Sequence, residues 1–143
     1  PFNCLPDADL WIALEAVNLK SVFNSRPEGL STLIGGGNSN AVELSVGQRQ
    51  LLCLARALLR RDQTLLLILD EASSFVDPRT DRLIRETIQE QFGNGQCTII
   101  IVAHRLSTIM RCDRVAVLQR GQLIACDRPE RVLTSMCASR HFL

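Results

Sequence analysis

The chain has 143 residues, 46% of them hydrophobic, which is enough for one domain with a real core. Its net charge of +1 argues against a broad electrostatic attraction to nucleic acid or acidic lipid. No apolar run approaches the roughly 20 residues that span a bilayer, and no signal peptide is visible. Six cysteines without paired close spacing argue against a zinc site and favour reduced thiols in a cytosolic setting.

The first predicted helix covers about Ala8–Leu19. Asp7 is its expected N-cap, and Leu10, Trp11, Leu14 and Val17 form an apolar stripe at helical spacing. We therefore interpret Trp11 as a core residue rather than as a platform for a ligand.

A glycine-rich loop extends from Gly35 to Asn40. Glycine runs can bind phosphate, but the phosphate loop of nucleotide hydrolases also needs a lysine followed by serine or threonine after its last glycine. The only lysine of the chain, Lys20, lies upstream of these glycines. The sequence therefore predicts a flexible connector here and no phosphate loop.

A second helix is predicted from Leu44 to about Arg61. Ser45 and Gln48 match a capping box, which is a sufficient structural explanation for both residues. Gly47 is not explained in this way, because glycine in a helix costs about 0.8–1 kcal/mol relative to alanine. A small residue and free N–H groups at a helix start are typical of a site where an anion approaches the backbone closely.

Five aliphatic residues, Leu65–Leu69, precede Asp70 and Glu71 without any alternation of polar and apolar side chains. This pattern predicts a strand of a parallel sheet that is covered on both faces. Ligands of open α/β sheets bind at the carboxyl ends of such strands. Asp70 and Glu71 are therefore candidate site residues, with a purely structural capping role as the equal alternative.

The next predicted helix covers about Arg79–Phe92, because Ile84, Ile88 and Phe92 recur on one face. Its charged residues are assigned to the solvated face: Arg79, Asp81, Arg82, Arg85, Glu86 and Glu90. A helix between two parallel strands is the expected crossover connection.

A second unalternating strand, Cys97–Ala103, ends at His104. A lone histidine after a strand is more often structural than catalytic. However, His104 follows a buried strand just as Asp70 and Glu71 do, and this equivalence favours a role in the site. Beyond it, Arg114–Gln119 and Gln122–Cys126 predict a hairpin around Arg120-Gly121, and a short helix is expected from Pro129.

These stretches together resemble ATP-binding cassette proteins. Leu44-Ser45-Val46-Gly47-Gln48 is similar to the signature motif of that family, with valine where glycine is commonest. Leu65–Glu71 resembles the Walker B motif, Ser74–Asp77 the D-loop, and His104 the switch histidine. The four motifs occur in the order of the family and at its approximate spacing, so the resemblance is far more specific than any single motif.

Within the family, the multidrug-resistance-associated branch of exporters is the most similar, on Val46, the run Leu44–Arg60 and the opening Pro1-Phe2-Asn3. The segment between Gly37 and Leu44 is several residues longer than the usual link. The Walker A loop, the Q-loop and an aromatic residue for adenine stacking are absent from the sequence. We therefore expect the chain to be the carboxyl-terminal part of a nucleotide-binding domain and the isolated chain to be inactive.

The resemblance implies a role for each motif. Asp70 holds Mg²⁺, Glu71 orients or deprotonates the attacking water, and His104 contacts the γ-phosphate of ATP. The signature residues Ser45, Val46, Gly47 and Gln48 close over ATP that is held by a partner domain. Ser74 and Asp77 of the D-loop count with the residues that bind nucleotide.

The implied fold is α/β: a partial P-loop NTPase domain with a parallel sheet flanked by helices and without the Walker A half. Residues 1–61 would supply part of a helical subdomain, and residues 62–143 part of the core. The implied function is ATP hydrolysis that powers export, at the cytosolic face of a membrane, with a second nucleotide-binding domain and transmembrane domains as partners and no nucleic acid. One alternative is a non-catalytic partner half that supplies only the signature helix, and another is an ATPase of the chromosome or repair type.

Overall fold

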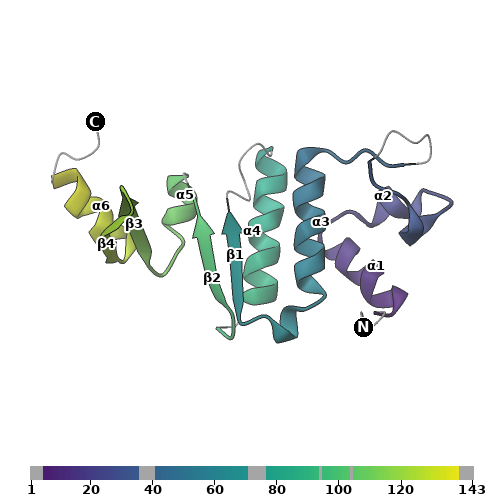
Figure 1. Ribbon diagram of the computed structural model, residues 1–143, viewed down its shortest axis with the longest axis horizontal. Coiled ribbons are helices and arrows are strands. Elements are labelled where there is room, and N and C mark those ends of the chain that lie inside the picture. The colour runs from purple at the N-terminus through teal and green to yellow at the C-terminus, as the bar shows by residue number, and fades with distance from the viewer. Residues whose placement is uncertain (1–4, 36–40, 71–76, 94, 104, 139–143) are drawn as a thin grey trace. The chain divides into compact units, whose positions relative to one another are not determined.

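The computed structural model describes residues 5–35, 41–70, 77–93, 95–103 and 105–138. The chain divides into two compact units, Pro1–Ile100 and Ile101–Leu143. The first unit contains, in chain order, α1 (Asp7–Ala16), α2 (Lys20–Asn24), the 3-10 turn η1 (Gly29–Ser31), α3 (Val46–Leu58), the 3-10 turn η2 (Arg61–Gln63), β1 (Leu66–Asp70), α4 (Pro78–Phe92) and most of β2 (Thr98–Val102) (Figure 1).

The first helix is shorter than the sequence pattern predicts. Pro6, and not Asp7, is the N-cap of α1, which ends at Ala16. Asn18 then adopts a left-handed conformation, with φ of 57°, and α2 follows from Lys20. Asparagine is one of the few residues that tolerate this conformation, so the break lies there. The predicted single helix over 8–19 is therefore wrong at its carboxyl end.

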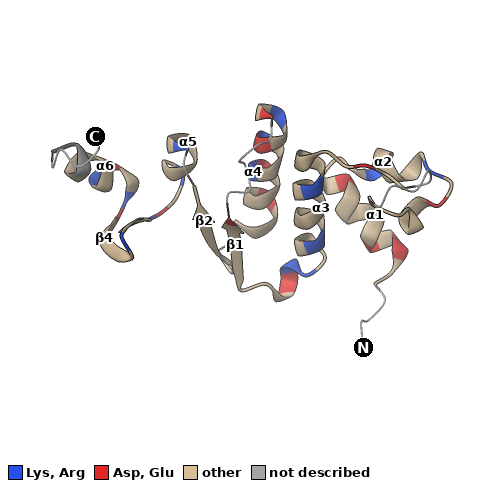
Figure 2. Cartoon of the chain, turned by 45° about the horizontal axis from the view of Figure 1, so that its top comes forward, with Lys and Arg blue, Asp and Glu red and all other residues tan. Residues whose placement is uncertain are grey.

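The core of the first unit lies between α1, α3 and α4. On α3, four apolar residues follow the i, i+3, i+4, i+7 spacing of one helix face, and all are buried: Leu51, Leu54, Ala55 and Leu58. Ile84, Ile88 and Phe92 form the matching stripe of α4, as predicted. Trp11 packs against this core, which confirms its structural assignment. Figure 2 shows that charged residues also occur along both helices.

β1 and β2 are neighbours in a small parallel sheet, and α4 forms the crossover between them. Leu67, Leu69 and Ile99 pack against the core, so α4 and its neighbours cover one face of the sheet.

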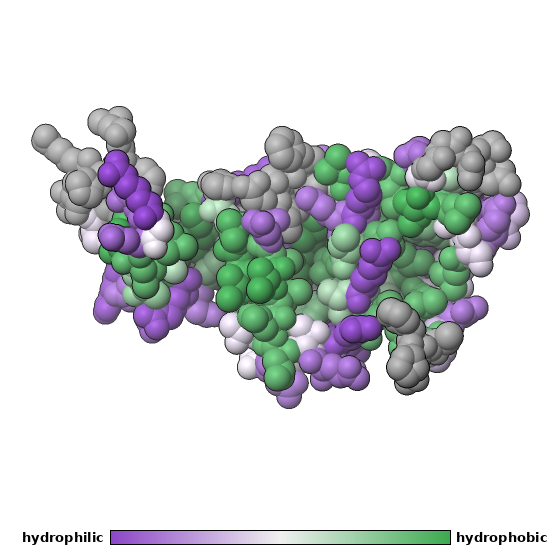
Figure 3. Space-filling model, viewed as in Figure 1, coloured by the Kyte–Doolittle hydropathy of each residue, from purple (hydrophilic) through white to green (hydrophobic). Residues whose placement is uncertain are grey.

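On the other face of this sheet, Leu66, Ile68 and Ile100 are 50%, 62% and 48% exposed. The space-filling view shows apolar surface over these strands (Figure 3). The prediction that β1 is covered on both faces is therefore wrong for the described residues of the first unit, because the helices of that unit pack on one side of the strand only.

The second unit contains α5 (Leu106–Ile109), β3 (Val115–Gln119), β4 (Gln122–Asp127) and α6 (Pro129–Ala138). β3 and β4 form the predicted antiparallel hairpin. Arg120 and Gly121 both have positive φ, at 50° and 78°, as a type I′ turn requires. The predicted helix start at Pro129 is also confirmed.

Candidate functional site

Three of the predicted site regions lie toward the same end of the first unit. Asp70 is the last residue of β1, Ser45 caps the start of α3, and Asp77 caps the start of α4. These three ends lie on the same side in Figure 1, because α3 and α4 run opposite to β1. The remaining predicted site residues lie outside the described residues: Glu71, Ser74 and His104.

The start of α3 is a complete capping box. The backbone N–H of Gln48 donates to Ser45 Oγ at 3.1 Å, and the backbone N–H of Ser45 donates to Gln48 Oε1 at 2.9 Å. The first turn-to-turn bond of the helix runs from Arg49 N to the carbonyl of Ser45 at 2.9 Å. The capping box that the sequence predicts is therefore confirmed.

The cap leaves a set of donors at the helix start. The N–H groups of Val46 and Gly47 precede the first turn-to-turn bond of α3, and such groups have no partner within a helix. The Ser45 hydroxyl and the Gln48 side-chain NH₂ are donors that the box does not use. Gly47 is buried, whereas Val46 is exposed. Chemically, this is a set of hydrogen-bond donors suited to an anion, and the helix dipole adds to their attraction.

Arg49 supports the residue that precedes the cap. Its Nη1 donates to the carbonyl oxygen of Leu44 at 2.7 Å, and Leu44 itself is buried in the core. The chain therefore enters α3 from an anchored position, which limits how far the donors of the first turn can shift.

Asp77 is the N-cap of α4, and both of its carboxylate oxygens are used. Oδ1 accepts from the backbone N–H groups of Arg79 and Thr80, each at 3.0 Å, and Oδ2 accepts from the Thr80 hydroxyl at 2.6 Å. The hydroxyl and amide donors of Thr80 stabilise the charged form and hold the pKa of Asp77 below its usual value. Pro78 occupies the first helical position, where its missing N–H is of no consequence.

Asp70 offers one exposed carboxylate at the carboxyl end of β1. Among the described residues, no group of three or more His, Cys, Asp or Glu could hold a metal ion. Mg²⁺ needs no such group, since it keeps several waters and is commonly bound by one or two carboxylates together with substrate phosphates. The Asp70 carboxylate therefore fits Mg²⁺ that arrives with a nucleotide.

Asp81 is a residue that the sequence reasoning misplaced. It is assigned above to the solvated side of its helix, but it is 3% exposed and its Oδ2 lies 2.9 Å from Arg85 Nη2. The signal was present in the sequence, because Asp81 precedes Ile84, Ile88 and Phe92 at i+3, i+7 and i+11. Register alone places it on the buried stripe.

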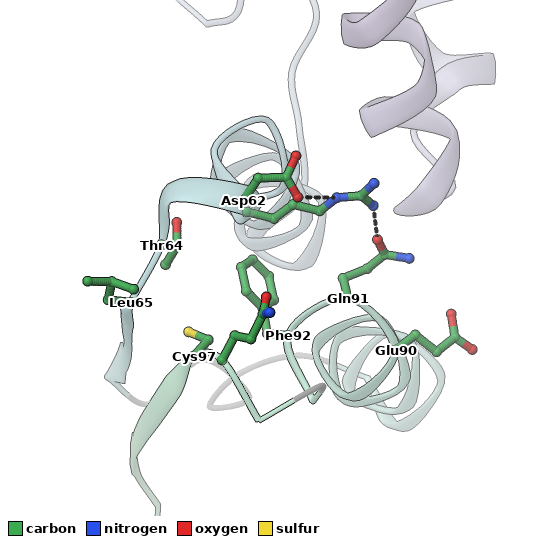
Figure 4. A pocket seen from close by; sticks show the side chains of 9 residues that line it. Asp62, Thr64, Leu65, Glu90, Gln91, Phe92 and Cys97 are labelled. Carbon is green, nitrogen blue, oxygen red and sulfur yellow. Dashed lines mark hydrogen bonds and ion pairs between the residues drawn. The ribbon is translucent and has the colours of Figure 1, made fainter.

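A pocket of about 560 Å³ lies at the opposite end of the same strands, near the end of α4 (Figure 4). Arg61 contacts Asp62 and Gln91 across its rim, and Phe92 lies in its wall. None of the predicted site residues lines this pocket. It is therefore separate from the end at which Asp70 and the two caps lie.

Comparison with known proteins identifies related sequences. The chain is 50% identical over 135 residues to "ATP-binding cassette sub-family C member 2" of Homo sapiens, which covers 93% of this chain and 8% of that protein. It is 47% identical over 129 residues to "ATP-binding cassette sub-family C member 4" of Homo sapiens, covering 90% and 9%. It is 44% identical over 134 residues to "Probable multidrug resistance-associated protein lethal(2)03659" of Drosophila melanogaster, covering 94% and 9%.

The chain therefore spans less than a tenth of the length of these three relatives. No family model matches it. Among the helices that the structure describes, none has the length and apolar character needed to cross a membrane.

Proposed function

We propose that this chain takes part in the ATP hydrolysis that powers transport across a membrane. The premise is that 90% to 95% of its length is homologous to a segment of ATP-binding cassette sub-family C transporters. The observation that carries the proposal is that the end of β1 at Asp70 and the capped starts of α3 and α4 lie on the same side of the first unit. Phosphoryl transfer to water needs a positioned nucleophile and neutralisation of phosphate charge, and this end supplies carboxylates and anion-binding donors.

Asp70, Glu71 and His104 are proposed to act on nucleotide bound by their own domain. Asp70 is the carboxylate that would hold Mg²⁺, which supplies positive charge against the phosphate oxygens when bound. Glu71 follows it directly and would orient the attacking water and accept its proton. His104 would donate a hydrogen bond to the γ-phosphate and respond to its loss.

The start of α3 is proposed to act on nucleotide held by a partner domain. The Ser45 hydroxyl, the N–H groups of Val46 and Gly47 and the Gln48 amide would donate to the γ-phosphate across a head-to-tail dimer. Ser74 and Asp77 would lie at the same interface. ATP then holds the two domains together, its hydrolysis separates them, and the attached transmembrane domains follow.

This proposal assigns residues 1–61 to part of a helical subdomain that presents the signature helix, and residues 62–143 to part of the catalytic core. Both would lie at the cytosolic face of the membrane. The identity to transporters of sub-family C over most of the chain supports this assignment.

The test replaces Glu71 by glutamine in the natural polypeptide that contains this chain. Glu71→Gln keeps the shape of the side chain but removes its basicity, so ATP turnover should fall about 100-fold or more while ATP binding persists. Glu86→Gln is the matched control, since Glu86 is an exposed acid on α4, and it should leave turnover within about twofold. Normal turnover with Glu71→Gln would contradict the proposal and favour a non-catalytic partner half.

A further inference from the structure

Asp81 lies where the pattern of α4 calls for an apolar residue. It begins the buried stripe that continues with Ile84, Ile88 and Phe92, and only 3% of it is exposed. Arg85, one turn further along the helix, is the partner of its Oδ2 at 2.9 Å, and the side chain of Arg85 is 29% exposed. A charge pair thus occupies the first position of a face that otherwise packs against the core.

Overall stability is a weak explanation for this arrangement. Removing a carboxylate and a guanidinium from water costs free energy that their attraction only partly restores, and well-packed apolar residues often serve as well. The helix dipole does favour an acid in the first turn, but an exposed acid would gain the same benefit without losing its hydration. The burial of Asp81 is therefore better explained by a local role in ordering the helix start than by a contribution to overall stability.

The backbone connects Asp81 to the cap of α4. Its N–H donates to the carbonyl oxygen of Asp77 at 3.0 Å, while the Asp77 carboxylate accepts from Arg79 and from Thr80. Thr80 and Asp81 are thus each hydrogen-bonded to Asp77 within a single turn. The position of this turn decides where the Asp77 carboxylate lies.

Helix ends fray, and the first turn of α4 is held to the second by the ion pair. Arg85 follows Ile84, which is buried in the core. The ion pair therefore joins the capped first turn to the buried part of α4 that begins at Ile84. A second pair with the same spacing, Arg82 and Glu86, lies 3.9 Å apart on the solvated side of the helix, with side chains that are 75% and 59% exposed. Exposed pairs of this kind contribute little, so of these two pairs the buried one is the better anchor for the turn.

We propose that Asp81 and Arg85 are positioning residues that hold the Asp77 turn to the following turn of α4, whose Ile84 is buried in the core, and so fix the Asp77 carboxylate for nucleotide turnover. The second half of this statement rests on the proposed function. The first half concerns only how rigidly the first turn of α4 is held, and a measurement without nucleotide tests it.

The first measurement is amide hydrogen exchange in the natural polypeptide that contains this chain, without nucleotide. Asp81→Asn keeps the shape of the side chain and removes its charge. We expect exchange at Arg79 and Thr80 to become about tenfold faster or more, with exchange over Ile88–Phe92 within about twofold of the unchanged protein. Glu86→Gln is the control and should change neither region, because it breaks only the exposed pair.

Two results of this measurement would overturn the proposal. Unchanged exchange at Arg79 and Thr80 would show that the pair does not order the turn. Faster exchange along the whole of α4 would show a general stabilising role. Should Asp81→Asn fail to fold, Arg85→Gln removes the pair from its more exposed side, and Arg85→Lys, which keeps the charge, should restore the protection that Arg85→Gln loses.

The second measurement is steady-state ATP turnover by the same variants. Positioning predicts that Asp81→Asn lowers kcat about tenfold or more and leaves KM for ATP within about twofold, since the pair does not touch the nucleotide. Local loss of protection with normal kcat would overturn the link between the turn and nucleotide turnover. Absence of turnover in the unsubstituted protein would instead contradict the proposed function, so the two failures are distinguishable.

Discussion

Ser45 and Gln48 hydrogen-bond each other across the first turn of α3, at 3.1 Å and 2.9 Å. Each residue therefore uses one oxygen as an acceptor inside the cap. The donors of the same two residues, a hydroxyl and an amide NH₂, are not used by the box and remain suited to an anion. The capping interpretation and the binding interpretation of this motif are thus compatible, because they use different atoms.

The capping box should contribute measurably to the stability of the helix. In a peptide of residues 43–63, Ser45→Ala removes the acceptor for the Gln48 N–H and should weaken the helix by about 1 kcal/mol. Ser45→Thr keeps a hydroxyl at the cap and should lose less. Helix content from circular dichroism measures both, and equal helicity in all three peptides would contradict the assignment.

Gly47→Asp should impair nucleotide held by the partner domain. The change adds a carboxylate and a Cβ where the γ-phosphate of the other domain is proposed to approach, so repulsion and steric conflict act together. The measurement traps nucleotide at each site separately in the natural polypeptide. Gly47→Ala, which adds only the Cβ, separates the two effects and should be milder. Loss confined to the site that contains Glu71 would refute the assignment across the dimer.

The isolated 143-residue chain should bind Mg-ATP weakly and hydrolyse none. Its sequence has no lysine after a glycine run, so the lysine ammonium group that usually binds the β- and γ-phosphates is missing. Titration calorimetry of the purified chain with Mg-ATP measures this directly. Saturable binding in the micromolar range would show that a different set of residues holds the phosphates.

The open face of the small sheet should make the isolated chain prone to association. Leu66, Ile68 and Ile100 expose apolar surface there, and adjacent parallel strands offer unpaired edges. Ile68→Thr keeps a β-branched residue and should raise the soluble fraction and lower binding of an apolar dye. Leu69→Thr is the contrasting variant, because Leu69 packs against the core, and it should lower solubility by destabilising the fold.

Low pH should weaken the start of α4 through Asp77. Hydrogen bonds from Thr80 and Arg79 lower the pKa of Asp77 in the helix from its ordinary 3.8, so the stabilisation is complete above that value. It is then lost as the pH falls through the lowered pKa. In a peptide of residues 77–93, Asp77→Asn keeps a capping oxygen that does not titrate, and its helicity should fall less in acid. Identical acid profiles for the two peptides would contradict this role.

Much of the local structure could be predicted because it depends on neighbours in the sequence. The periodicity of α3 and α4, the cap at Ser45 and the Arg120-Gly121 turn all involve residues a few positions apart. The break at Asn18 was missed, since an apolar stripe that continues through Val17 gives no sign of a left-handed residue after it. Asp81 was missed because its charge was given more weight than its register.

The sequence by itself determined the longer helices α3 and α4, the strands and the hairpin turn of the chain, and its likeness to ATP-binding cassette proteins, since short-range spacing and ordered motifs carry that information. Only the tertiary structure decided that Ile68 is exposed while Leu69, its neighbour in β1, packs against the core. The same holds for the burial of Asp81 beside Arg85. The physical reason is that burial depends on which surfaces meet, and an apolar strand has the same sequence whether one of its faces is covered or both.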